Sequence, residues 1–156
     1  METFPLLLMF FYGTLKWGQS NHERFCRGAV RIEPAKTFGQ LYELPFGFPG
    51  LYVDAANVRA FGTRDYPADA EKQSESAPPL SSGPGGDLVH GQLFIFDNPE
   101  KRLIAFDALE GYIPGENSLY KRVLIPVKST GGTLLAWAYK LKRPAGAYLL
   151  GGSWPA

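Results

Sequence analysis

The chain has 156 residues, 45% of them hydrophobic and 20% charged, which fits one soluble globular domain with a substantial core. Its 16 Lys and Arg against 15 Asp and Glu give a net charge of +1, which provides no basis for a nucleic-acid partner. The single cysteine, Cys26, excludes an internal disulfide and a cysteine-based metal site. We therefore expect a cytoplasmic protein with one domain over residues 1–156, although a secreted protein without cysteines would look the same.

The first strand signal is the apolar run at residues 5–12, with the sequence PLLLMFFY, which stops abruptly at Gly13. No Lys or Arg precedes this run, no small-residue cleavage site follows it, and it is too short to span a bilayer. We interpret it as a fully buried strand and expect no membrane partner.

Strand and turn signals dominate the following residues, because 18 glycines, 13 prolines and a 14% aromatic share are typical of a sheet with many turns. The pattern predicts a short helix over residues 21–27, strands over 28–32, 37–44 and 57–62, and a loop over 45–50. Residues 74–86 contain four Ser, three Pro and three Gly. This composition predicts a flexible loop at about residues 63–87, inside one domain.

The second half of the chain returns to strand alternation and contains one clear helix. Strands are expected over residues 88–96, 120–128 and 133–141, with Gly131-Gly132 as a hairpin turn. Between them, Asp97-Asn98-Pro99-Glu100 is a helix start with a polar cap residue and proline at the first helical position. Leu103, Phe106 and Leu109 then form an apolar stripe, and Gly111 is expected to cap the end.

Glu110 occupies the last turn of this predicted helix, where unpaired carbonyl groups and the helix dipole disfavour a carboxylate. Burial and the dipole both predict a raised pKa for Glu110, and a carboxyl group that titrates near neutrality is a better general base. Asp107, one turn earlier on a similar face, is the competing candidate.

The turn that follows the first strand, Tyr12-Gly13-Thr14-Leu15, is the second candidate for chemistry. A buried strand that ends in a glycine turn leaves backbone N–H groups without a ladder partner, and such groups can hold an anion or a carbonyl oxygen. By itself this pattern is a weak indication of a binding site, because many strands end at glycine. It indicates an active site only if a catalytic residue from elsewhere in the chain lies next to the turn.

Together these two motifs resemble the γ-glutamylcyclotransferase-like superfamily. The string at residues 12–22, YGTLKWGQSNH, is most similar to the γ-glutamylamine cyclotransferase branch, and Leu119-Tyr120-Lys121-Arg122-Val123 also matches a strand opening in that branch. The resemblance implies an α+β fold, a small mixed β-barrel with flanking short helices. It also implies that Tyr12, Gly13, Thr14 and Leu15 cradle the substrate, that Glu110 is the catalytic acid/base, and that Tyr120 and Tyr139 border the pocket.

The implied reaction converts a γ-glutamyl amine or γ-glutamyl amino acid to 5-oxoproline and a free amine. Glu110 would take a proton from the α-ammonium and deliver it to the departing amine, while the backbone N–H groups stabilise negative oxygen. The reaction is intramolecular and needs no cofactor or metal, so the expected partner is a small γ-glutamyl substrate.

The same residues are also compatible with two other functions. The protein could remove a γ-glutamyl protecting group in a biosynthetic pathway, or it could be a non-catalytic small-molecule-binding protein on the same scaffold.

His22 is expected to order the segment after the turn, and Cys26 to be a buried small hydrophobe. Gln92 stands where relatives often carry an acid, and Lys16, Lys121 and Arg122 could steer an anionic substrate, although surface charges are the default. The leaving amine and the oligomeric state stay undetermined.

Overall fold

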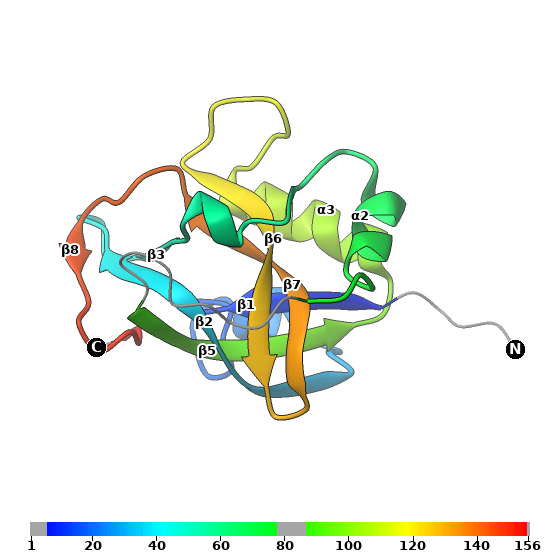
Figure 1. Ribbon diagram of the computed structural model, residues 1–156, viewed down its shortest axis with the longest axis horizontal. Helices are drawn as coiled ribbons and strands as arrows, with labels where there is room; N and C mark the ends of the chain where they lie inside the picture. The colour runs from blue at the N-terminus through cyan, green and yellow to red at the C-terminus, as the bar shows by residue number, and fades with distance from the viewer. Residues whose placement is uncertain (1–5, 78–86, 156) are drawn as a thin grey trace, which may run out of the picture.

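Strands of a single sheet close into a barrel in the computed structural model, which describes residues 6–77 and 87–155 (Figure 1). Around the barrel, neighbouring strands are paired in the order β1 (Leu7–Phe11), β5 (Asp87–Phe96), β2 (Arg31–Glu43), β3 (Pro49–Tyr52) and β7 (Gly132–Leu141). The pairing of Met9 with Trp137 joins β1 to β7 and closes the ring. Apolar side chains from alternate strand positions therefore enclose a common interior.

The remaining elements extend or cover this barrel. They are α1 (His22–Phe25), the 3₁₀ turn η1 (Ala55–Asn57), β4 (Ala60–Phe61), α2 (Tyr66–Lys72), α3 (Pro99–Glu110), β6 (Tyr120–Ser129) and β8 (Ala147–Tyr148). β6 pairs with β7 along its whole length, and α2 and α3 lie side by side against one end of the sheet (Figure 1). This architecture confirms the predicted α+β barrel with short helices. Within the described ranges, no helix is long and apolar enough to cross a membrane.

Several predicted element boundaries were wrong. The two strands expected over residues 28–32 and 37–44 are one strand, β2, whose pairing with β5 continues through Pro34, opposite Gln92. The loop expected over 45–50 ends early because β3 already begins at Pro49. The strand expected over 57–62 is divided between η1 and the two-residue β4.

The flexible loop predicted at about residues 63–87 needs a correction. It contains α2, in which the Asp65 side chain accepts a hydrogen bond from the Ala68 N–H and proline lies in the first turn. This is the same type of helix start that correctly predicted α3, and it was masked by the Ser, Pro and Gly residues that follow. Residues 78–86 lie outside the described residues.

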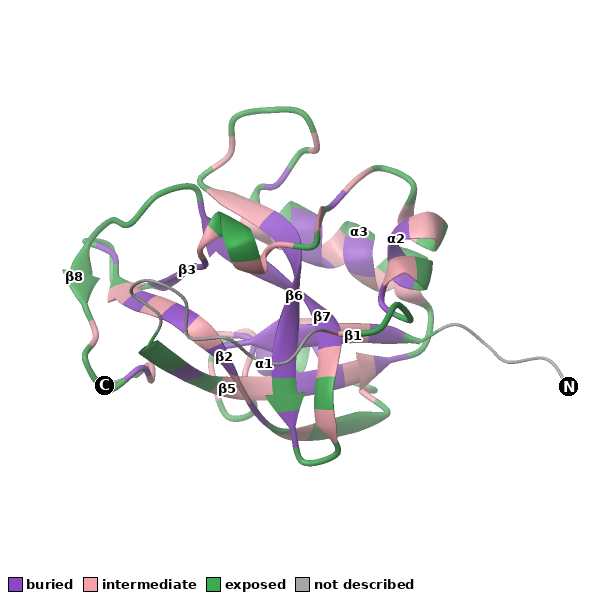
Figure 2. Cartoon of the chain, in the orientation of Figure 1, coloured by how far each residue is buried: buried purple, intermediate pink, exposed green. Residues whose placement is uncertain are grey.

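Helix α3 confirms the predicted bounds and the predicted cap at Gly111, which adopts φ 67°. Asn98 differs from expectation, because its side chain makes no capping hydrogen bond and its backbone is left-handed at φ 54°. Leu103 and Phe106 are fully buried against the barrel, as the apolar stripe predicted. Figure 2 shows buried positions continuing from α3 through β1, β6 and β7.

A buried group of charges, here called the arginine cluster, joins the helices to the barrel. It consists of Arg122 on β6, Asp69 on α2 and Asp107 on α3. Arg122 has 0% exposure, and its Nε and Nη1 lie 2.8 Å from Asp107 Oδ1 and 3.0 Å from Asp69 Oδ2. The suggestion that Arg122 lies at the surface and steers substrate is therefore wrong. A Cβ at Gly62 would come within 2.6 Å of the guanidinium, so only glycine fits there.

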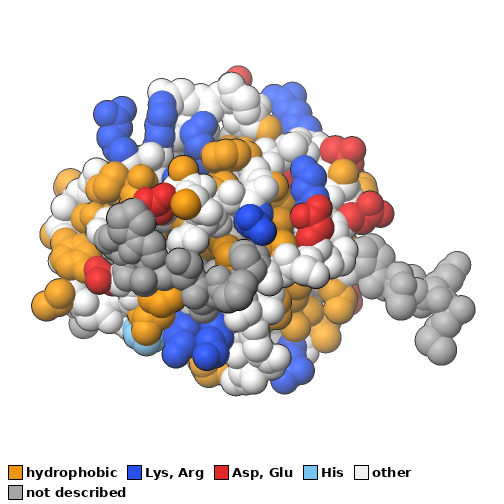
Figure 3. Space-filling model, viewed as in Figure 1, with side chains coloured by type: hydrophobic (Ala, Val, Ile, Leu, Met, Phe, Trp, Pro, Cys, Tyr) orange, Lys and Arg blue, Asp and Glu red, His pale blue; other side chains and the backbone are white. Residues whose placement is uncertain are grey.

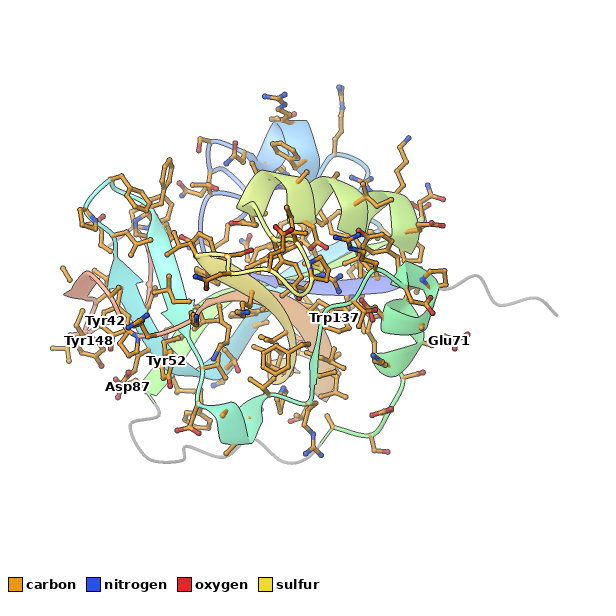
Figure 4. The ribbon with its side chains drawn as sticks, turned by 90° about the horizontal axis from the view of Figure 1, so that it is seen from above. Tyr42, Tyr52, Glu71, Asp87, Trp137 and Tyr148 are labelled. Atoms are coloured by element: carbon orange, nitrogen blue, oxygen red, sulfur yellow. The ribbon has the colours of Figure 1, made fainter. Side chains whose placement is uncertain are left out.

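Trp137 on β7 covers the arginine cluster from the barrel side. Its ring centroid lies 4.7 Å from the Arg122 guanidinium carbon, and its indole N–H donates to the Asp69 carbonyl at 3.1 Å. Figure 4 shows Trp137 toward the α2 end of the sheet, while Tyr42 and Tyr148 pack together at the opposite end. The face seen in Figure 3 carries apolar side chains interspersed with charges of both signs.

Removal of Arg122 tests this account of the fold. We expect Arg122→Leu to lower the free energy of unfolding by about 3–5 kcal/mol, because two buried carboxylates lose their counter-charge. Urea denaturation at neutral pH measures the change. The control is Arg64→Leu, which replaces an exposed arginine and should change stability by less than about 1 kcal/mol. Equal effects of the two substitutions would contradict a central role for Arg122.

Candidate active site

A cavity of about 190 Å³ opens where β1 and α3 end and where β3 and β6 begin. It is lined by every site residue that the sequence predicted, namely Tyr12, Gly13, Thr14, Leu15, Glu110, Tyr120 and Tyr139. Its volume is below the range of about 300–1,000 Å³ that is usual for drug-sized ligands, so it suits a small chemical group. The structure thus brings together two motifs that lie far apart in the sequence.

Tight packing fixes the glycine turn, residues 12–15, at the cavity wall. A Cβ on Gly13 would lie 2.7 Å from Pro49 Cγ, which explains why glycine is needed there. The Thr14 hydroxyl accepts a hydrogen bond from the Asn21 side chain at 2.8 Å, and the Thr14 carbonyl accepts one from the Asn21 N–H at 2.9 Å. Asn21, which also lines the cavity, was missed as a site residue.

Two further residues hold the segment after the glycine turn. The His22 ring nitrogen Nδ1 lies 3.2 Å from the Leu15 carbonyl oxygen, which agrees with the ordering role expected for His22. The Gln92 side chain accepts a hydrogen bond from the Trp17 N–H at 2.7 Å, so the amide that replaces an acid here has a structural use.

The backbone N–H groups of residues 13–15 donate to no acceptor among the parts of the chain that the structure describes. They belong to a turn that is mostly buried and that lines the cavity. Buried N–H groups are almost always paired in proteins, so an unpaired set beside a cavity is suited to an anionic or carbonyl oxygen of a ligand.

Glu110 supplies a carboxyl group to the cavity. Burial, and to a smaller extent the negative charge of Asp107, raise the pKa of Glu110 from 4.5 to about 7. At neutral pH the carboxyl group is therefore divided between its protonated and ionised forms, and it can both accept and donate a proton. This agrees with the raised pKa expected from its place at the end of α3.

Asp107, the competing candidate, is occupied elsewhere. Its two carboxylate oxygens accept hydrogen bonds from Arg122, at 2.8 and 3.1 Å, and one of them also accepts the Tyr139 hydroxyl at 2.5 Å. Asp107 does not line the cavity, whereas Glu110 does. The geometry thus favours Glu110 as the acid/base and gives Asp107 the role of positioning Tyr139.

Hydrogen bonds to the protein hold all three cavity tyrosines. The Tyr12 hydroxyl donates to the Tyr139 carbonyl at 2.6 Å, and the Tyr120 hydroxyl donates to the Pro49 carbonyl at 2.7 Å. Burial raises the pKa of Tyr12, Tyr120 and Tyr139 above the usual tyrosine value. The three rings are therefore neutral at physiological pH and form a fixed, weakly polar lining.

Other polar candidates from the sequence lie away from this chemistry. Cys26 is buried, and burial raises the pKa of its thiol to about 12, in line with a packing role. The Lys16 ammonium donates a hydrogen bond to the Trp154 carbonyl. Across residues 6–77 and 87–155, no three His, Cys, Asp or Glu side chains come together in a way that could hold a metal ion.

The sequence model of one family, described as "Gamma-glutamyl cyclotransferase, AIG2-like", matches residues 9–73 and 63–156. The chain therefore belongs to this family, which confirms the superfamily resemblance and the expectation of a γ-glutamyl cyclotransferase-like enzyme. It is 26% identical over 137 residues to γ-L-glutamyl-butirosin B γ-glutamyl cyclotransferase from Niallia circulans, a match that covers 86% of this chain and 67% of that relative.

Solved structures show the same fold. YkqA from Bacillus subtilis superimposes with a TM-score of 0.60 at 17% identity over 96% of this chain, which spans only 39% of the YkqA chain. An AIG2-like protein from Mus musculus gives a TM-score of 0.56 at 20% identity, covering 90% of this chain and 80% of its own. At these identities the likeness shows the barrel fold alone.

The raised pKa of Glu110 has a consequence for stability. Because its pKa is higher in the folded chain, at about 7, than the ordinary 4.5, ionisation of Glu110 destabilises the fold. This penalty is absent at a pH below about 4.5, grows as the pH rises and is complete above about pH 7.

We therefore expect Glu110→Gln to be more stable than the wild type by about 3–4 kcal/mol near pH 8, because the pKa rises from 4.5 to about 7 and each pKa unit is worth about 1.4 kcal/mol. The advantage should shrink toward zero as the pH falls below about 4.5, where Glu110 is protonated in the unfolded as well as the folded state. Chemical denaturation of both proteins across this range measures the difference. A stability difference that does not change with pH would contradict the raised pKa.

Proposed function

We propose that this protein cleaves γ-glutamyl amides by cyclisation and releases 5-oxoproline and a free amine. The observation that carries the proposal is that one small cavity is lined both by Glu110, with a pKa of about 7, and by residues 13–15, whose backbone N–H groups have no acceptor among the described residues. Family membership supports the same class of reaction.

In the proposed mechanism Glu110 moves the protons. Its ionised carboxylate takes a proton from the substrate α-ammonium, and the neutral α-nitrogen then attacks the γ-carbonyl carbon. The bond from this carbon to the amine nitrogen breaks, the ring nitrogen gives up a second proton, and the departing amine gains the two protons by way of Glu110. No water is consumed, and a pKa near neutrality suits Glu110 to both directions of transfer.

The glycine turn has the complementary role of stabilising negative oxygen. The N–H groups of residues 13–15 bind the substrate carboxylate or the oxygen charge that develops on the γ-carbonyl. Because the turn is fixed by Pro49 and Asn21 before substrate arrives, these donors need little reorganisation during the reaction. The narrow cavity also holds the flexible glutamyl chain in a ring-like conformation, which lowers the entropic part of the barrier.

The relative from Niallia circulans is named for a γ-L-glutamyl-butirosin B substrate, which favours a second candidate function. In that reading the protein removes a γ-glutamyl protecting group from a biosynthetic intermediate. The bond broken and the roles of Glu110 and of residues 13–15 are the same, so the two candidates differ only in the amine that leaves.

Replacement of Glu110 tests the proposal. Wild-type protein incubated with a panel of γ-glutamyl amides, including γ-glutamyl-ε-lysine, should release 5-oxoproline, detected by mass spectrometry. Glu110→Gln should reduce kcat/KM by about 10²–10⁴-fold, because the proton transfers lose their acid/base.

The matched control is Glu100→Gln, an exposed acid in the first turn of the same helix, which should retain wild-type activity. A lack of 5-oxoproline from every amide, with wild type equal to Glu110→Gln, would leave only the non-catalytic binding function.

The pH dependence of the reaction is a separate prediction. Since the ionised form of Glu110 is the base, kcat/KM should fall about tenfold per pH unit below a pKa of about 7. Initial rates between about pH 5 and pH 8 measure this limb. A profile that stays flat down to about pH 5 would show that another group, or no ionisable group, limits the reaction.

A further inference from the structure

We infer that Phe46 and Phe48, here called the aromatic wall, bind the leaving amine and select substrates in which this amine carries an apolar group. The inference rests on the proposed function and adds a substrate class to it. Both residues lie in the turn between β2 and β3 and line the cavity that contains Glu110.

The aromatic wall is exposed at the cavity mouth although the deeper lining is buried. Phe46 is 57% exposed and Phe48 is 49% exposed, whereas Phe10 and Phe11 at the same cavity are 0% and 3% exposed. Exposed Phe rings are costly to hydrate, and placing two of them beside a catalytic cavity provides a surface that an apolar ligand can cover.

Hydrogen bonds hold the wall in place without a ligand. The Leu44 N–H donates to the Phe48 carbonyl at 2.8 Å, and the Gly47 N–H donates to the Leu44 carbonyl at 2.9 Å. The two rings pack at a centroid distance of 5.7 Å, and the next residue, Pro49, accepts the Tyr120 hydroxyl. A surface ordered in advance loses little conformational entropy when a ligand binds to it.

Cavity polarity decides which half of the substrate reaches the wall. The glutamyl half carries a carboxylate and an ammonium, and it matches the N–H groups of residues 13–15 and the carboxylate of Glu110. With a volume of about 190 Å³, the cavity has little room beyond that half, so the amine extends to the mouth. Among the described residues that line the cavity, Glu110 alone is an acid or a base of the Asp, Glu, Lys and Arg types. A charged amine substituent therefore finds no counter-charge, whereas an apolar one finds two rings.

A matched pair of substrates tests this inference. γ-Glutamyl-ethylamide and γ-glutamyl-phenethylamide differ only by a phenyl ring at the far end of the amine, so the bond that breaks has the same chemistry in both. We expect wild-type kcat/KM to be about tenfold higher for the phenethylamide, the usual size of discrimination by a partly open apolar site. γ-Glutamyl-ε-lysine, with a charged amine substituent, should react no faster than the ethylamide.

The variant Phe46→Ala/Phe48→Ala should remove this preference and give a phenethylamide-to-ethylamide ratio near one. The control is Phe61→Ala, an equally exposed Phe (54%) on β4 that does not line the cavity and should keep the tenfold ratio. Circular dichroism of each variant checks that the fold is retained.

Calorimetric binding of both amides to Glu110→Gln gives a readout that does not depend on turnover, and the phenethylamide should bind about tenfold more tightly. A wild-type ratio near one, or a preference that survives loss of both Phe rings, would overturn the aromatic wall while leaving the cyclotransferase function intact. Absence of 5-oxoproline from all three amides would overturn the proposed function, and equal affinities in calorimetry would then overturn the wall as well.

Discussion

The ion pairs of Arg122 are the interaction on which the arrangement of this protein depends. One guanidinium holds Asp69 of α2 and Asp107 of α3 against β6, so both helices are tied to the barrel from within. Asp107 connects the arginine cluster to the cavity through two hydrogen bonds. The Tyr139 hydroxyl donates to Asp107, and the Tyr139 carbonyl accepts the Tyr12 hydroxyl. The end of α3, and with it Glu110, is thereby fixed beside the glycine turn.

The same cluster also contributes to the raised pKa of Glu110. It holds two carboxylates against one guanidinium, and Lys72, 3.6 Å from Asp69, is partly exposed at its edge. Burial is the largest cause of the raised pKa of Glu110, and the charge of Asp107 adds to it. Burial raises the pKa of Asp107 too, but hydrogen bonds from Arg122 and Tyr139 oppose that shift, whereas the described residues that line the cavity with Glu110 include no Lys or Arg. Two acids on one helix thus have different electrostatic environments because their partners differ.

Short sequence motifs, such as a helix start or a glycine turn, predicted those parts of the fold and of the site that depend on neighbouring residues in the chain. Gly111 caps α3, and β1 ends at Phe11 just before Gly13, so Glu110 and the glycine turn could be located from the sequence and from the family resemblance. Arg122 could not be recognised as buried, because its partners Asp69 and Asp107 lie 53 and 15 residues away in the chain. Phe46 and Phe48 were missed for a related reason, since a Phe-Gly-Phe turn in isolation does not reveal which cavity it borders.

The two halves of the cavity are supported by different parts of the molecule. Glu110 and Tyr139 depend on the arginine cluster, whereas the aromatic wall depends on a hydrogen-bonded turn of a few residues that, within the described part of the chain, shares no hydrogen bond with that cluster. Changes at sites without shared partners act almost independently, so the wall can alter without a loss of the acid/base chemistry. The two halves meet at Pro49, which fills the space beside Gly13 and accepts the Tyr120 hydroxyl. A shift of Pro49 would move the N–H groups of the glycine turn and the aromatic wall together. Pro49 therefore limits how far the part of the cavity that binds the leaving amine can change without displacing the part that binds the glutamyl group.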